Sequence, residues 1–260
     1  QYILANLIED ELEEKDFAVT QSKSLGSTTI FDALKNGNID IYVDYSGTLW
    51  TNQMQRKDLL DRAQLDQQLD TWLKTQGITN LGALGFENAY CLAMRREKAE
   101  ALGVKSIEDL VPLAPQLRIG SDFEFLSRPE WYRLRDSYAL QFAEQKRFAP
   151  TLMYAALQKG EVDLITAFTS DGRIAAQDLV ILSDPKDAMF PYQALLLVNQ
   201  HFLQDEDAVD AVKVMVGNIS LEEMQSANLM VDRKSDALTP QEAAKWLQKQ
   251  LAEDSKANND

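Results

Sequence analysis

Aromatic side chains stand beside several predicted strand boundaries of this sequence: Tyr45, Trp50, Tyr90, Phe168 and Tyr192. The face of an aromatic ring carries partial negative charge, so it attracts a weakly hydrated cation, above all a quaternary ammonium group. Each ring contributes about 0.5–2 kcal/mol, and four rings would supply a useful share of the ~8 kcal/mol that a micromolar site requires. Any single ring is explained more simply by core packing. Their recurrence at strand ends, beside small polar residues, favours a cation-binding site.

Charged residues add a second group of candidates. Arg128, in the loop FLSRPEW, could pair with a ligand carboxylate through its planar guanidinium, although an arginine in a loop is often an ordinary surface residue. Both interpretations stay open. Four acidic residues are possible members of acid–base pairs: Asp122, Glu124, Asp163 and Asp171.

The residues needed for catalysis or metal binding are scarce. The one cysteine, Cys91, lies in the apolar run AYCLAM, which indicates a buried and unreactive thiol. The one histidine, His201, has no neighbouring motif for a metal site or a catalytic triad. The sequence contains no glycine-rich phosphate loop and no G-x-S-x-G motif. We therefore expect no enzyme activity, no cofactor and no metal, and an enzyme on a similar fold is the disfavoured alternative.

Composition narrows the choice of partners. The 260 residues suffice for one large domain or two lobes, and 45% of them are hydrophobic, as in globular proteins. With 26 Lys+Arg against 41 Asp+Glu, the net charge of −15 disfavours nucleic acid and anionic lipid as partners. No run approaches the roughly 18 consecutive apolar residues of a membrane span, so we expect no membrane insertion. A single cysteine fits the cytosol and the periplasm equally well.

The elements that must position these residues alternate between helix and strand. The patterns predict helices over 2–17, 27–36, 51–76, 105–114, 129–140 and 151–159, and two or three more between 206 and 251. Either Ser27 or Thr28 is expected to cap the second helix. Strands are predicted over 18–25, 39–43, 90–95, 117–122, 161–168, 179–184 and 194–199, with a loop over 81–89. The alternation predicts an α/β fold with mixed, largely parallel sheets.

One segment occurs twice. Residues 33–46 (ALKNGNIDIYVDYS) and 156–169 (ALQKGEVDLITAFT) share a pattern at a constant offset of 123 residues. Chance similarity between two helix–turn–strand units is one explanation, and two similar lobes are the other. In the second case Tyr45 and Phe168 end equivalent strands and face each other across a cleft, where open α/β sheets bind ligands. Asp40 and Asp163 also coincide, which favours a structural turn or cap role for both.

Several segments together resemble one family over nearly the whole chain. ALKNGNIDIYVDYSGT, LGFENAYCLAMRRE, DFEFLSRPEW, GEVDLITAFTSDGRI and FPYQALLLV are similar to segments of the substrate-binding proteins of ABC importers for osmoprotectants such as glycine betaine, choline and proline betaine. The resemblance implies the two-lobed type II fold of periplasmic binding proteins, with the ligand in a cleft between the lobes. The implied lobes are 1–86 with 191–260, and 87–190, joined by hinge strands near Phe86 and Phe190.

The resemblance also implies a set of ligand contacts. The aromatic cage carries over to Tyr45, Tyr90, Phe168 and Tyr192. Thr48 and Arg128 match positions that contact the carboxylate end of the ligand, and Asn88 matches a position that lines the site. Tyr42 is expected to pack within its lobe, and Trp50, which looks exposed, to pack in its loop without touching the ligand.

The sequence departs from the family pattern in two places. Phe168 stands where the family usually has tyrosine, so a ring face is kept and a hydroxyl is lost. Family members begin with a strand and a lysine that helps to bind carboxylate, and the sequence starts beyond both, at Gln1. We expect truncation or disorder at this end, which removes the evidence for export and for one ligand contact.

These expectations describe a transport protein. It would capture a quaternary ammonium osmoprotectant and deliver it to an ABC permease, in the periplasm or tethered outside the cytoplasmic membrane. The alternatives are a ligand-sensing or permease-fused domain of the same fold, or a binder of another small cationic or amino-acid-like solute. The sequence leaves open which ligand is bound.

Overall fold

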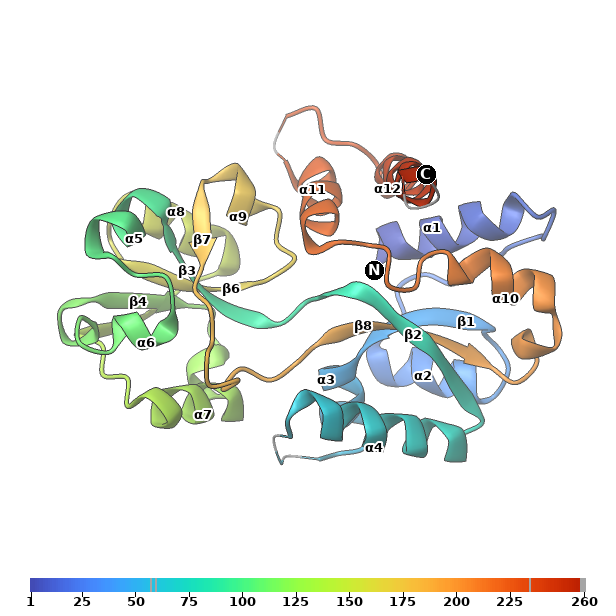
Figure 1. Ribbon diagram of the computed structural model, residues 1–260, viewed down its shortest axis with the longest axis horizontal. Coiled ribbons are helices and arrows are strands. Elements are labelled where there is room, and N and C mark those ends of the chain that lie inside the picture. Colours follow the sequence, from blue (N-terminus) through green and yellow to red (C-terminus); the bar gives the residue numbers. More distant parts are fainter. Residues whose placement is uncertain (57, 59, 234, 258–260) are drawn as a thin grey trace. The chain divides into compact units, whose positions relative to one another are not determined.

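The computed structural model describes residues 1–260 except 57, 59, 234 and 258–260. The chain divides into two compact units. Unit 1 comprises Gln1–Asn88 and Pro191–Asp260, and unit 2 comprises Ala89–Phe190. Each contains a β-sheet flanked by helices, which confirms the predicted α/β class (Figure 1).

Unit 1 is built on a three-stranded sheet in the order β1-β8-β2. The strands are β1 (Ile41–Tyr45), β2 (Ile78–Glu87) and β8 (Gln193–Asn199). Both pairings are antiparallel, so the prediction of largely parallel strands is wrong for this unit. The reason is the connectivity: β8 enters unit 1 after the chain has passed through unit 2, and it runs opposite to both neighbours.

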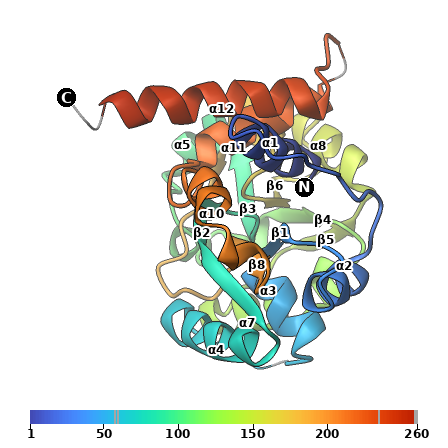
Figure 2. The same ribbon diagram turned by 90° about the vertical axis from the view of Figure 1, so that its right-hand side faces the viewer.

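Helices cover both faces of this sheet (Figure 1). They are α1 (Tyr2–Glu13), α2 (Ser27–Lys35), α3 (Ser46–Thr48), α4 (Arg62–Thr75), α10 (Glu206–Lys213), α11 (Leu221–Asp232) and α12 (Pro240–Ala257), with a π-helix over Leu49–Gln53 and a 3₁₀ turn over Phe202–Gln204. The apolar stripe of α1 is buried at Ile3, Leu4, Leu7, Ile8 and Leu12. It packs against α10 and α12, and α12 also lies along α11 (Figure 2).

Four local predictions for unit 1 need correction. The strand predicted over 18–25 does not form, because this segment finds no partner strand among the described residues. The second helix begins at Ser27 with Gly26 as its N-cap, and no side chain caps it. The loop predicted over 81–89 is largely strand β2, whose alternation is interrupted by Gly82 and Gly85 at φ of 141° and 120°. The helix predicted over 51–76 is divided between the π-helix and α4, and residues 57 and 59 of that range lie outside the described residues.

Unit 2 contains a five-stranded sheet in the order β5-β4-β6-β3-β7. The strands are β3 (Tyr90–Arg95), β4 (Arg118–Ser121), β5 (Glu144–Arg147), β6 (Leu164–Phe168) and β7 (Leu179–Ile181). β4 runs parallel to β5 and β6, whereas β3 runs antiparallel to β6 and β7. The sheet of unit 2 is therefore mixed, as predicted.

The helices of unit 2 enclose an aromatic part of its core. They are α5 (Arg96–Leu102), α6 (Ile107–Leu110), α7 (Pro129–Tyr138), α8 (Pro150–Gln158) and α9 (Arg173–Ala176), with 3₁₀ turns over Ala114–Gln116 and Phe125–Ser127. Ser106 caps α6 in a reciprocal capping box with Asp109, and Pro129 begins α7, where a helix is predicted to start. Phe125 is fully buried and lies beside Trp131, with ring centroids 5.9 Å apart.

The sequence repeat is confirmed at the level of secondary structure. Helix α2 and strand β1 of unit 1 correspond, at the same offset, to α8 and β6 of unit 2. The glycine after each helix has a left-handed backbone, with φ of 72° at Gly37 and 70° at Gly160, which explains why both positions are glycine. Tyr45 and Phe168 are the last residues of the two equivalent strands.

The two aspartates of the repeat have different partners. In unit 1, Asp40 Oδ1 accepts a hydrogen bond of 3.1 Å from the side-chain amide of Asn199. In unit 2, Asp163 is 5% exposed, accepts hydrogen bonds from the Arg118 backbone N–H at 2.7 Å and Nε at 3.0 Å, and pairs with Lys98. Burial opposes ionisation of Asp163, but the hydrogen bonds from Arg118 and Lys98 outweigh burial and hold its pKa below the usual range. Asp163 therefore has a structural role in unit 2, where it connects strand β6 to Arg118 of β4 and to Lys98 of α5.

We predict that Asp163→Asn lowers the free energy of unfolding at pH 7 by about 1–3 kcal/mol, because two partly buried cations lose their counter-ion. A carboxylate with a depressed pKa stabilises the fold above the ordinary carboxyl pKa, and this stability is lost as the pH falls. The difference between wild type and variant in urea unfolding should therefore shrink from pH 7 to pH 3. Asp40→Asn, the matched control, should cost less than about 1 kcal/mol. An Asp163→Asn effect that is equal at both pH values would contradict the assignment.

Candidate functional site

In unit 1, the end of β1 presents Tyr45 and leads directly into helix α3, which contains Thr48. Tyr45 is half-buried, and its backbone N–H donates to Asp44 Oδ1 at 2.8 Å. Burial raises the pKa of the Tyr45 phenol to about 12, so the ring carries a neutral hydroxyl at pH 7. Thr48 is partly exposed one helical turn further along.

The side chains before Tyr45 stabilise the strand. The Tyr42 hydroxyl donates to Asp44 Oδ2 at 2.8 Å, and both residues are buried. Burial raises the pKa of Asp44 to about 6. Tyr42 therefore packs within its unit, as the sequence predicts.

Tyr192 lies directly against the backbone of Gly47. A Cβ atom placed on Gly47 would lie 2.4 Å from Tyr192 Cε1, so any larger residue would displace the ring. Ser46 reinforces this contact: its hydroxyl accepts a hydrogen bond from the Gln193 N–H at 3.0 Å and donates to the Pro191 carbonyl at 3.2 Å. Sequence reasoning missed both residues, although the small Ser-Gly pair after Tyr45 marks where a backbone can approach closely.

Asn88 joins the same group through the backbone. Its N–H donates to the Tyr192 carbonyl at 2.9 Å, and its side chain is partly exposed. Unit 1 thus contains four of the expected ligand contacts, namely Tyr45, Thr48, Asn88 and Tyr192. The hydrogen bonds connect the last two to each other, and the Gly47 contact connects Tyr192 to the end of β1.

Trp50 is outside this group. It is fully buried, which corrects the expectation of exposure, and its indole N–H donates to the Asp58 carbonyl at 2.7 Å. The prediction that it packs in its loop is confirmed.

In unit 2, pairing of strands β3 and β6 sets Tyr90 opposite Phe168. The centroids of the two rings are 4.5 Å apart, and Phe125 lies 4.7 Å from Tyr90 on the buried side of the cluster. Phe168 is 39% exposed, a large fraction for an aromatic side chain at a strand end. Phe125 was not among the residues predicted for the site.

Arg128 lies beside this aromatic cluster. The Cζ atom of its guanidinium is 5.6 Å from the centroid of Tyr90, within the range of a cation–π contact. Its Nη1 is 3.1 Å from Glu124 Oε2, and its Nε is 3.6 Å from Glu130 Oε2. Tyr90, Arg128 and Phe168 are therefore together in unit 2, and the arginine demonstrates that the face of Tyr90 accommodates a cation.

The other candidates for acid–base or thiol chemistry have structural partners. Asp171 accepts from the Tyr154 hydroxyl at 2.7 Å and pairs with Arg173 at 2.6 Å. Cys91 is buried, and burial raises the pKa of its thiol to about 12, which keeps it protonated as predicted. Among the described residues, no group of His, Cys, Asp and Glu could hold a metal ion. The helices in the described part of the chain include none long and apolar enough to cross a membrane.

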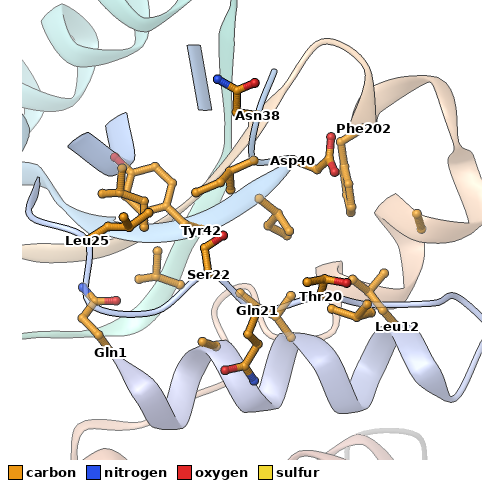
Figure 3. Close-up of a pocket in the computed structure, with 18 of the residues that line it drawn as sticks. Gln1, Leu12, Thr20, Gln21, Ser22, Leu25, Asn38, Asp40, Tyr42 and Phe202 are labelled. Carbon is orange, nitrogen blue, oxygen red and sulfur yellow. The ribbon is translucent and has the colours of Figure 1, made fainter. Parts of the chain in front are cut away.

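Unit 1 also contains a cavity of about 1010 Å³ between α1, the segment 17–25 and β1 (Figure 3). Gln1, Gln21, Asp40, Tyr42 and Phe202 are among the residues around it. None of the seven residues predicted for the ligand site lines this cavity, so it is separate from the place where the aromatic residues gather.

Comparison with known proteins identifies a family. Residues 1–249 match the family described as the substrate-binding domain of ABC-type glycine betaine transport systems. The chain is 28% identical over 257 residues to a glycine-betaine-binding protein of Pseudomonas aeruginosa, covering 94% of this chain and 82% of the relative. It is 26% identical over 236 residues to the ergothioneine transport permease/ergothioneine binding protein EgtU of Helicobacter pylori, covering 89% of this chain but only 42% of that longer protein.

A solved structure agrees with the family match. The crystal structure of a glycine betaine/carnitine/choline ABC transporter protein superposes with a TM-score of 0.88 at 26% identity, covering 95% of this chain and 93% of the other. The fold is accordingly the two-lobed type II fold of periplasmic binding proteins, as the sequence predicts.

The contact between Gly47 and Tyr192 leads to a prediction. Gly47→Ala should displace the Tyr192 ring and lower the free energy of unfolding by about 1–3 kcal/mol, the usual cost of overpacking. Calorimetric melting measures the loss, and a double-mutant cycle with Tyr192→Ala should abolish most of it, because the smaller residue makes room. Gly26→Ala is the matched control, since a Cβ there meets nothing within 4 Å. A full Gly47→Ala cost in the Tyr192→Ala background would refute the proposed contact.

Proposed function

This chain belongs to the family of substrate-binding domains of ABC-type glycine betaine transport systems, and on that premise we propose that it captures a quaternary ammonium solute and presents it to an ABC permease. Members of the family are extracytoplasmic binding proteins of transport systems, which are not an enzyme class. We propose the same location for this chain, in the periplasm or tethered to the membrane, and release of the solute without chemical change.

The aromatic cluster of unit 2 is the observation that carries this proposal. A quaternary ammonium group has no N–H to donate, so a protein recognises it through ring faces rather than hydrogen bonds. Tyr90 and Phe168 stand side by side at paired strand ends, and a guanidinium already lies 5.6 Å from the Tyr90 centroid. We propose that Tyr90 and Phe168 of unit 2 and Tyr45 and Tyr192 of unit 1 all contribute to binding the ammonium group.

The chemistry of the relatives' ligands narrows the class of ligand that we propose for this chain. Glycine betaine, carnitine and ergothioneine, which appear in the names of the related proteins, each combine a trimethylammonium group with a carboxylate. Arg128 and Thr48 are the residues we assign to the carboxylate, since a guanidinium and a hydroxyl both donate to it. Asn88 is assigned to the lining of the site. Phe168 in place of the usual tyrosine keeps the ring face and removes one hydroxyl from it.

A second candidate function is a permease-fused domain of the same fold. It is favoured by the Helicobacter pylori relative, whose name combines a permease with a binding protein and of which this chain spans 42%. The length of the complete gene product distinguishes the two, because a fused permease adds several membrane-spanning helices.

Calorimetric titration with glycine betaine, choline, carnitine, proline betaine and ergothioneine tests the proposed function. We expect at least one of them to bind and to be recovered unchanged, as checked by NMR of the solute after incubation. No binding of any, or turnover of one, would refute the proposal.

For the ligand that binds, Tyr90→Ala and Tyr192→Ala should each weaken binding by about 1–3 kcal/mol, through lost cation–π attraction and packing. Tyr132→Ala, which removes an exposed tyrosine from α7 of unit 2, is the matched control and should leave the dissociation constant unchanged. Unaltered affinity in both cage variants would show that the cage has been assigned to the wrong residues.

Arg128→Ala tests which end of the ligand Arg128 contacts. If Arg128 pairs with the carboxylate, its removal should weaken glycine betaine binding by about 1.5–3 kcal/mol, the worth of a charge-assisted hydrogen bond. Choline has no carboxylate, so its affinity should change far less. Arg135→Ala, which removes an exposed arginine of α7 that pairs with Asp136, serves as control. Equal losses for both ligands would exclude a carboxylate-specific role.

A further inference from the structure

One carboxylate connects the aromatic cluster of unit 2 to the loop that carries Arg128. Asp122 follows strand β4, and its Oδ2 accepts a hydrogen bond of 3.1 Å from the Tyr90 hydroxyl. Its Oδ1 accepts from the backbone N–H groups of Glu124 at 2.7 Å and Phe125 at 2.8 Å. The two carboxylate oxygens of Asp122 therefore have distinct roles, because Oδ2 bonds the ring hydroxyl and Oδ1 bonds the loop backbone.

The Oδ1 atom shapes the loop. By accepting from residues two and three positions further on, it forms an Asx-type turn that starts the 3₁₀ segment Phe125–Ser127. The turn fixes Phe125, which is fully buried and supports one side of Tyr90. Arg128 follows directly, as the N-cap residue of α7.

The Oδ2 atom acts on the ring. We propose that Asp122 is a positioning residue for ammonium binding: it holds Tyr90 by its hydroxyl and, through this charge-assisted hydrogen bond, makes the ring face more negative. This inference rests on the proposed function, and it assigns Asp122 a role through Tyr90 rather than a contact with the ligand.

Electrostatics supports the direction of this hydrogen bond. Burial, and then the charge of Asp122, raise the pKa of Tyr90 above its usual range, so the phenol stays protonated and donates to the carboxylate. A hydrogen bond to a charged acceptor is stronger than one to a neutral acceptor, and it polarises the donor group further. Donation to the Asp122 carboxylate gives the phenol more of the character of a phenolate and so raises the electron density of the ring. A more electron-rich ring face attracts a cation more strongly.

Asparagine at this position separates the two roles. In Asp122→Asn the amide oxygen can still accept from Glu124 and Phe125, which preserves the turn. The amide nitrogen then faces the Tyr90 hydroxyl as a donor, and the negative charge is gone. Asp122→Ala removes both roles, and Tyr90→Phe removes only the link to the ring.

The effect should appear at the ammonium end of the ligand. Asp122→Asn should weaken glycine betaine and choline alike, by about 3–10-fold each, because the two ligands share the trimethylammonium group. Arg128→Ala, in contrast, should distinguish between them. Asp136→Asn, which removes an exposed carboxylate of the same unit paired with Arg135, is the matched control and should leave both affinities unchanged.

The experiment combines calorimetry with NMR of protein labelled with ¹³Cζ-tyrosine, the Tyr90 resonance being identified by its loss in Tyr90→Phe. We expect Asp122→Asn to move this resonance to lower chemical shift, and the double variant Asp122→Asn/Tyr90→Phe to bind no more weakly than the weaker single variant. Unchanged affinity in Asp122→Asn, or losses that add fully in the double variant, would overturn the inference. The NMR shift reports the Asp122–Tyr90 hydrogen bond without any ligand. If the wild-type protein binds none of the ammonium solutes, that result refutes the proposed function separately.

Discussion

The antiparallel pairing of β3 with β6 is the constraint on which the candidate site of unit 2 depends. It places Tyr90 opposite Phe168, and the two rings are then in contact in a tilted arrangement, with centroids 4.5 Å apart. The Ala89 N–H donates to the Thr169 hydroxyl at 3.1 Å and so extends this connection beyond the last strand residues. A one-residue slip of the register would send the side chains of one strand to the other face, so the buried residues of both strands indirectly fix the rings.

Unit 1 also holds two aromatic residues at a strand end, but through different contacts. Its repeat-equivalent strand, β1, also ends in an aromatic residue, but β1 pairs with β8, and Tyr45 lies opposite Ala194. The second ring, Tyr192, comes from the residue just before β8 and is fixed by the backbone of Gly47 and the hydroxyl of Ser46. The repeat therefore conserves the position of the strand end, while each unit holds its second aromatic residue by its own contacts.

Sequence periodicity predicted the parts that depend on local order. The helices α1, α2, α7 and α8 and the strands β1, β4 and β6 lie close to where their apolar patterns indicate, because burial of one face imposes those patterns. Strand β2 escaped prediction because Gly82 and Gly85 interrupt its alternation. The directions of the strands in unit 1 depend on how the chain returns from residue 190, and a local pattern does not contain that information.

The site shows the same division between local and long-range information. Its aromatic residues are visible in the sequence because they stand beside strand ends, and the family resemblance then selects among them. Ser46, Gly47 and Phe125 hold these aromatic residues in place through contacts that span long sequence separations, as between Ser46 and Gln193. The residue types alone do not indicate this role. Asp122 was visible as an acidic residue, but its partners and not its type distinguish a positioning role from acid–base chemistry.

Local charge, rather than the net charge of −15, decides how such a site could treat a zwitterion. A betaine carries no net charge, so the overall field of the protein attracts and repels its two ends almost equally, and screening shortens that field to about 8 Å at physiological ionic strength. Orientation must come from groups at contact distance. In unit 2, Asp122 accepts a hydrogen bond from the hydroxyl of Tyr90, and Arg128 lies 5.6 Å from the centroid of its ring, so a negative and a positive group both contact one aromatic residue. A trimethylammonium group that approaches the ring face gains from the first, and a carboxylate gains from the second. The polarity of a bound betaine would then follow from these two residues, whereas the rings alone would accept any cation of suitable size.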